Sequence, residues 1–209
     1  MYKVTMYKVQ RILISLLFVM LSISLSAGNF SADSLLLDAY KKEDMSVWKE
    51  YVDSLSLLHS FTPSLLTYEY GFCGYMVDRD KPHALPYVTR FKEHVEAQKK
   101  TLPAGHYEMY RSAVLVFELR LHESIHPVKS MSLAKEAVKL APKDPVVLTY
   151  YGTCLFYAPK PFGSKEEALI WFEKADKYFR APQWKFCWLK EANSMYIKQC
   201  KDKLQKDKK

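Results

Sequence analysis

The chain has 209 residues, of which 49% are hydrophobic and only 6 are glycine; this composition excludes a disordered chain and disfavours an all-β fold, whose tight turns usually need glycine. The net charge is +8, but the first 28 residues contribute three positive charges and the tail from Lys198 a net four, which leaves +1 for residues 29–197. Such a nearly neutral body excludes a general electrostatic surface for nucleic acid.

The first 28 residues have the three parts of a secretory signal. Positive charges precede an apolar run from Ile12 to Leu25, and small residues follow at 26–28. The run is shorter than the roughly 20 apolar residues that span a bilayer. We therefore predict a signal peptide over residues 1–28 and an exported protein without a stable membrane span after cleavage. Its expected location is the periplasm, with secretion as the alternative, and whether the chain starts at Met1 or Met6 stays open.

Apolar residues recur at helical spacing along the rest of the chain. Several helix starts are marked by a capping residue or a proline: Pro63, Asp144 before Pro145, and Ser164 with Glu167 three residues on. These signals predict an all-α fold with helices over residues 32–43, 45–60, 63–78, 83–99, 104–122, 127–140, 145–157, 165–179 and 183–204.

Two stretches that lie 81 residues apart share a pattern. Residues 70–73, Tyr-Gly-Phe-Cys, align with residues 151–154, Tyr-Gly-Thr-Cys, and the same offset pairs Phe91 with Phe172. Between these copies, Ser130, Ala134 and Ala137 have the spacing of Ala168, Phe172 and Ala175. An internal repeat of this kind indicates three helix pairs with a period of about 40 residues, preceded by an extra pair and followed by a capping helix.

Residues 145–178 resemble a tetratricopeptide repeat with a lengthened turn. The matching positions are Leu148, Tyr151, Gly152 and Leu155 in the first helix and Ala168, Phe172 and Ala175 in the second. The resemblance implies a right-handed α-α superhelix, a TPR-like solenoid over residues 29–209, that binds other proteins and is not an enzyme. A physical reason supports the match, because Gly152 and Ala168 would let two helices approach closely and Phe172 would fill the remaining gap.

The first helix of each pair in this family lines an inner face, where a partner peptide or helix can lie. The resemblance therefore implies candidate partner-binding residues, most of them aromatic, at Phe72, Tyr75, Thr149, Thr153, Phe156, Trp184 and Trp188. Aromatic side chains dominate many protein interfaces because they bury a large area at low entropy cost. The alternative is that these aromatic residues fill the core between helices.

The segment His122-Glu123-Ser124-Ile125-His126 matches the zinc-peptidase pattern HExxH, which makes a zinc metallopeptidase the alternative function. That chemistry needs both histidines on one face of an uninterrupted helix. Pro127 follows directly, and a residue before proline is displaced from the helical region by steric clash. No histidine follows His126 as a third ligand. We therefore predict no catalytic residue, no bound metal and no cofactor.

The four cysteines are Cys73, Cys154, Cys187 and Cys200. Their spacing fits neither a CxxC pair nor a zinc knuckle. Export would permit a disulfide, and Cys154 with Cys187 is the pair that neighbouring first helices would allow. We expect free thiols, although the pairing of these two cysteines stays open.

Overall fold

The computed structural model describes residues 32–58, 63–122 and 127–206, and all regular secondary structure in these ranges is helical. The described residues divide into two compact units, one that ends at Leu58 and one that follows it. The single domain that the sequence predicted over residues 29–209 stays a prediction. The predicted signal peptide, residues 1–28, lies outside the described residues.

The first unit contains the predicted N-terminal helix pair, α2 (Ala32–Lys41) and α3 (Met45–Leu58). The two helices pack on each other, and the indole Nε1 of Trp48 donates a hydrogen bond to the backbone carbonyl of Leu36 at 2.8 Å. The ring of Trp48 also lies 5.8 Å from that of Tyr40. This buried tryptophan therefore joins the two helices through both its ring and its polar atom.

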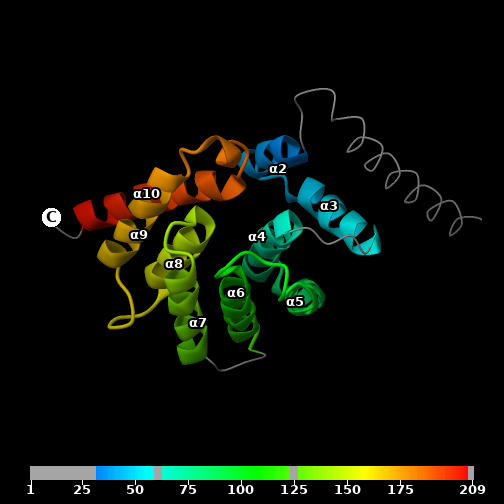
Figure 1. Ribbon diagram of the computed structural model, residues 1–209, viewed down its shortest axis with the longest axis horizontal. Coiled ribbons are helices and arrows are strands. Elements are labelled where there is room, and N and C mark those ends of the chain that lie inside the picture. Colours follow the sequence, from blue (N-terminus) through cyan, green and yellow to red (C-terminus); the bar gives the residue numbers. More distant parts are fainter. Residues whose placement is uncertain (1–31, 59–62, 123–126, 207–209) are drawn as a thin grey trace, which may run out of the picture. The chain divides into compact units, whose positions relative to one another are not determined.

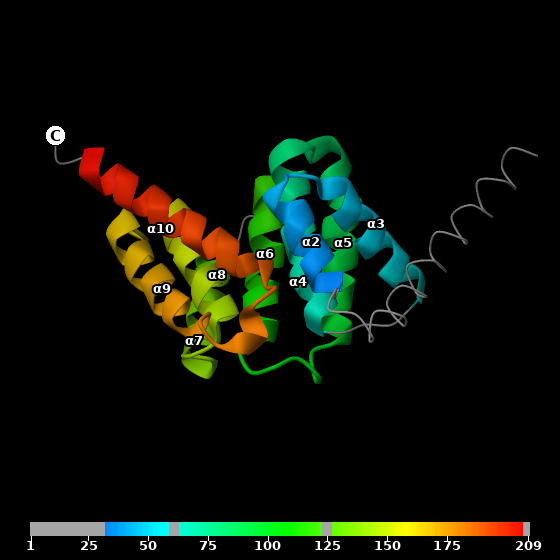
Figure 2. The same cartoon turned by 90° about the horizontal axis from the view of Figure 1, so that it is seen from above.

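The second unit contains three helix pairs and a final helix (Figures 1 and 2). The helices are α4 (Pro63–Arg79), α5 (Lys81–Ala97), α6 (His106–Arg120), α7 (Pro127–Leu140), α8 (Pro145–Tyr157), α9 (Lys165–Tyr178), the 3-10 turn η2 (Pro182–Trp184) and α10 (Trp188–Lys206). Helices α4 and α5, α6 and α7, and α8 and α9 pack as pairs, and α10 packs on α9. This pairing of adjacent helices confirms the predicted order of elements.

Several predicted helix boundaries were wrong. Helix α6, predicted over residues 104–122, spans only His106–Arg120. The helix predicted over residues 183–204 is interrupted, because η2 ends at Trp184 and α10 begins only at Trp188. Helix α5 begins at Lys81, before the predicted residue 83, since Pro82 lies in its first turn, where the missing backbone N–H of proline costs nothing.

The predicted capping residues of α8 and α9 have the expected roles. Asp144 accepts hydrogen bonds from the backbone amides of Val146 and Val147 at 2.9 and 3.1 Å. Ser164 accepts one from the amide of Glu167 at 3.1 Å. These bonds satisfy amides that have no partner within their own helix, so the sequence located both starts correctly.

The small residues of the repeat lie where helices approach most closely. Ala134, Ala137, Ala168 and Ala175 are fully buried, as is Phe172. A Cβ atom built on Gly152 of α8 would lie 2.7 Å from Cε1 of Phe172 on α9, so only glycine fits there without displacing the ring. The predicted close approach of these two helices is confirmed.

Candidate functional site

The seven residues predicted to contact a partner differ in their accessibility. Phe72, Thr149, Phe156 and Trp188 are buried, Thr153 and Trp184 are half-buried, and Tyr75 is 39% exposed. The four buried side chains occupy core positions between helices, which was the alternative to partner contact. Tyr75, Thr153 and Trp184 stay candidates for partner contact.

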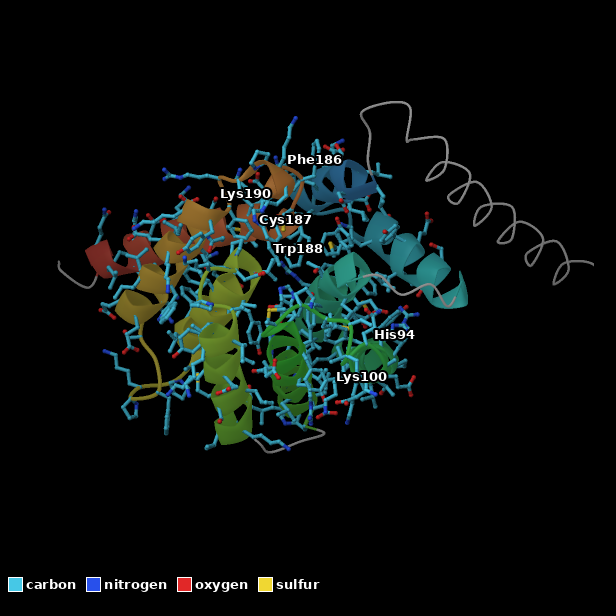
Figure 3. All side chains as sticks on the ribbon, viewed as in Figure 1. His94, Lys100, Phe186, Cys187, Trp188 and Lys190 are labelled. Carbon is cyan, nitrogen blue, oxygen red and sulfur yellow. The ribbon has the colours of Figure 1, made fainter. Side chains whose placement is uncertain are left out.

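Trp188 is buried because the start of α10 lies against the first helices of the preceding pairs (Figure 3). Its ring is 6.2 Å from that of Tyr70 on α4. Tyr70 also contacts the rings of Phe117 on α6 and Tyr150 on α8, each at 5.9 Å. Together these four side chains join α4, α6, α8 and α10 in one aromatic cluster. The inner-face pattern of the family could not indicate that Trp188 is buried, because the cluster depends on the packing of the start of α10 against α4.

Thr149 is buried because it takes part in a hydrogen-bond chain that attaches α10. Its hydroxyl donates to Oδ1 of Asn193 at 3.1 Å, and Nδ2 of Asn193 donates to the backbone carbonyl of Phe172 at 3.0 Å. Asn193 has no exposed surface. One asparagine thus links α8, α9 and α10, and sequence reasoning missed it. The available signal was a polar residue on the stripe formed by Leu189, Asn193 and Tyr196.

The two buried phenylalanines of the prediction each pack within an aromatic group. Phe72 on α4 lies 5.0 Å from the ring of Tyr87 on α5, in an edge-on arrangement. Phe156 at the end of α8 lies 5.5 Å from the ring of Tyr196 on α10. Because rings in such arrangements contribute to packing beyond their buried area, both side chains stabilise contacts between helices.

Buried polar side chains form a second set of contacts that sequence reasoning missed. Glu69 on α4, which is 2% exposed, lies 2.8 Å from Nδ1 of His94 on α5, and Arg90 Nε is 3.7 Å from the same carboxylate. Between α6 and α8, the hydroxyl of Tyr150 donates to Oγ of Ser112 at 2.8 Å. Polar groups of this kind are stable in a core only when they are hydrogen-bonded, so these contacts specify which helix surfaces meet.

The ion pair between His106 and Asp144 connects the start of α6 to the start of α8. Nε2 of His106 lies 3.0 Å from Oδ2 of Asp144. The preceding residue, Gly105, has φ 79°, and a Cβ atom there would lie 2.5 Å from the carbonyl oxygen of Ala137 on α7. Burial by itself would raise the pKa of Asp144, but the hydrogen bond and charge of His106, together with the helix amides, lower it below its usual value.

We expect Asp144→Asn to lower the free energy of unfolding by about 1–2 kcal/mol at neutral pH, because asparagine keeps the helix cap but loses the charge-assisted bond to His106. The pKa of Asp144 is lower in the folded chain than in the unfolded chain. The contribution of the Asp144 carboxylate to the free energy of unfolding is therefore complete above about pH 4. This contribution is lost as the pH falls through the pKa of Asp144 in the folded chain. Urea denaturation at neutral and strongly acidic pH measures both effects. A difference between the proteins that persists unchanged in strong acid would contradict this account.

All four cysteines are free thiols in the structure. Burial, with a smaller effect of Glu69, raises the pKa of Cys73, and burial raises the pKa of Cys154 to about 12. Since the thiolate is the reactive form, both thiols are protonated and poorly nucleophilic at neutral pH. The two thiols therefore act as small apolar side chains in the packing of their helices.

The HExxH segment begins beyond the end of α6. Helix α6 ends at Arg120, and His122 is exposed with φ 66°, a left-handed conformation that does not continue a helix. Residues 123–126 lie outside the described residues, and α7 begins at Pro127. The sequence predicted that the helix runs to His122, and this boundary was wrong, because the helix ends at Arg120 and His122 lies in the turn. Among the residues that the structure describes, no three His, Cys, Asp or Glu side chains are grouped to hold a metal ion.

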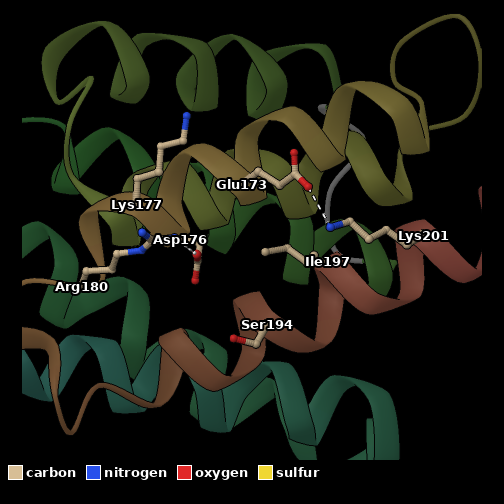
Figure 4. Close-up of a pocket in the computed structure, with 7 residues that line it drawn as sticks. All are labelled: Glu173, Asp176, Lys177, Arg180, Ser194, Ile197 and Lys201. Carbon is tan, nitrogen blue, oxygen red and sulfur yellow. Dashed lines mark ion pairs between the residues drawn. The ribbon is translucent and has the colours of Figure 1, made fainter.

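A groove with a volume of about 390 Å³ lies between α9 and α10 (Figure 4). Charged and polar side chains surround a single apolar residue: Glu173, Asp176 and Lys177 come from α9, Arg180 from the turn that follows it, and Ser194, Ile197 and Lys201 from α10. Glu173 and Lys201 form an ion pair across the groove at 2.9 Å. The groove is therefore open to solvent and lined mostly by charged and polar side chains.

Comparison of the chain with known protein families, with curated proteins and with solved structures gave no match. Within residues 32–58, 63–122 and 127–206, no helix is both long enough and apolar enough to cross a membrane.

Proposed function

We propose that this protein is an exported, non-enzymatic interaction module of the tetratricopeptide-like class, which binds a segment of a partner protein in the cell envelope. The observation that carries the proposal is the open groove between α9 and α10. Its edges offer both charge signs, and Ile197 offers an apolar contact, as a peptide or helix of mixed character requires.

The packing of the second unit supports the solenoid part of this proposal. Each adjacent helix pair packs closely, and equivalent positions of the repeat, such as Phe91 and Phe172, are both fully buried. Helix α10 packs on α9 as the first helix of a further unit would, and its side chains Ser194, Lys198 and Asp202 are exposed. A polar outer face is the usual end of a repeat array. Tyr75, Thr153 and Trp184 are proposed as further partner contacts on the inner face.

The zinc-peptidase alternative has less support. Its chemistry requires His122 and His126 on one helical face, but His122 lies beyond α6 in a left-handed conformation. We therefore propose no catalytic role for Glu123.

Site-specific photo-crosslinking in the native host tests the proposed function. A photoreactive amino acid at Ser194, which is exposed on the groove, should give one discrete adduct with another envelope protein, and Ile197→Asp should abolish it. The same probe at Lys139, exposed on α7, serves as the matched control and should not give this adduct. No adduct from Ser194, or the same adduct from both positions, would contradict a partner site in the groove.

A further inference from the structure

Two aromatic side chains protrude from the end of the α8–α9 pair. Tyr157, the last residue of α8, is 67% exposed, and Phe162, in the loop before α9, is 66% exposed. The ring of Tyr157 lies 5.0 Å from that of Phe156 and 6.2 Å from that of Tyr196, so its position is fixed by packing. Both exposed rings belong to the end of α8 and the loop that follows it, and exposed apolar surface of this kind marks an interaction site.

Two lysine side chains lie over the ring of Phe156, the buried neighbour of Tyr157. The ammonium groups of Lys165 and Lys203 lie 4.1 and 5.2 Å from the ring centroid of Phe156, and Lys165 also donates a hydrogen bond to the backbone carbonyl of Phe156. Within the described part of the chain, neither lysine forms an ion pair with a carboxylate. Lys160 is exposed in the same loop. Two cations are therefore held beside one ring.

One acidic side chain lies close to this group. The pKa of Glu166 is lowered by a hydrogen bond from its own backbone amide, by another from Ser164, and by the charges of Lys160 and Lys165. Glu166 is therefore ionised. Three lysines against this one carboxylate leave an excess of positive charge. We call Tyr157, Lys160, Phe162, Lys165 and Lys203 the aromatic–lysine patch.

We propose that the aromatic–lysine patch attaches the protein peripherally to an anionic lipid surface. Tyrosine and other amphipathic rings are stable at the level of lipid headgroups, and lysines nearby are attracted to the negative headgroups of such a surface. The shape of the patch favours a membrane over a peptide, because Tyr157 and Phe162 protrude, whereas a peptide needs a groove. The groove between α9 and α10 contains none of the patch residues. This inference is independent of the proposed function.

Vesicle sedimentation with the whole chain tests the proposal. The wild-type protein should bind vesicles of equal parts phosphatidylglycerol and phosphatidylcholine more tightly than vesicles of phosphatidylcholine alone, and added salt should weaken the binding. Replacing both Lys165 and Lys203 with Gln should weaken binding to the anionic vesicles by about thirtyfold, since each lysine near such a surface contributes about fivefold. Replacing both Tyr157 and Phe162 with Ser should also weaken it.

Matched variants make the result specific. Lys139→Gln with Lys143→Gln removes two exposed lysines, one near the end of α7 and one in the turn before α8. Ile170→Ser removes a side chain that is 65% exposed on α9. Both variants should bind like the wild type. Circular dichroism checks that every variant is folded. Equal wild-type binding to both vesicle types, or patch variants that bind as tightly as the controls, would overturn the proposal. If the wild type does not bind vesicles, and the patch variants lose the photo-crosslinked protein adduct, the proposal would be overturned in favour of a protein partner.

Discussion

Gly152→Leu should lower the free energy of unfolding by about 3 kcal/mol, at the upper end of the usual cost of overpacking a core. Even a Cβ atom at this position would lie 2.7 Å from Cε1 of Phe172, a ring with no exposed surface. Leucine adds further atoms in the same direction, so α8 and α9 must separate. Urea denaturation followed by circular dichroism measures the change, and a variant with wild-type stability would show that these helices do not pack through Gly152.

Gly74→Ala is the matched control for this prediction. Gly74 also lies within a helix, α4, but a Cβ atom there would meet its nearest neighbour, the ring of Phe117, at 3.9 Å, an ordinary contact distance. Alanine is favoured over glycine within helices by up to about 1 kcal/mol. We therefore expect Gly74→Ala to leave the stability unchanged or to raise it slightly.

Asn193→Ala should lower the free energy of unfolding by about 3 kcal/mol, because a buried group that loses its hydrogen-bond partner costs about 1–3 kcal/mol. Two such groups are affected, the hydroxyl of Thr149 and the backbone carbonyl of Phe172. The same substitution should loosen α10, since this asparagine joins it to α8 and α9. Hydrogen exchange of the α10 amides, measured with the overall stability, distinguishes local loosening from global unfolding.

Ser194→Ala is the neighbouring control. The hydroxyl of Ser194 donates to the backbone carbonyl of Lys190 within its own helix and is exposed to solvent, so its removal should change the stability by less than about 0.5 kcal/mol. Equal effects of the two substitutions would contradict a special role for Asn193.

Much of the fold could be predicted because its determinants are local. The starts of α8 and α9 depend on Asp144 and Ser164, whose capping bonds reach only two or three residues along the chain. The close approach at Gly152 could also be predicted, because a repeated spacing of small residues indicates where helices pack. The break at residues 185–187 was missed, since no proline or glycine lies within it.

The candidate site was harder to predict because it depends on contacts between distant residues. Thr149 and Asn193 are 44 positions apart, and His106 and Asp144 are 38 apart, so no local pattern joins them. The predicted inner-face residues followed the spacing of the repeat, which specifies the direction of a side chain but not what lies beyond it. Trp188 of α10 is buried, and its ring lies 6.2 Å from that of Tyr70 on α4.

The attachment of α10 through Asn193 has a consequence for the order in which the protein acquires its structure during synthesis. Helices α8 and α9 emerge before α10, so the carbonyl of Phe172 and the hydroxyl of Thr149 first bond to water. Tyr196, whose ring stacks on Phe172 at 5.1 Å, also arrives later. The last pair can therefore form early from its own contacts, but its core is closed only by a helix made afterwards.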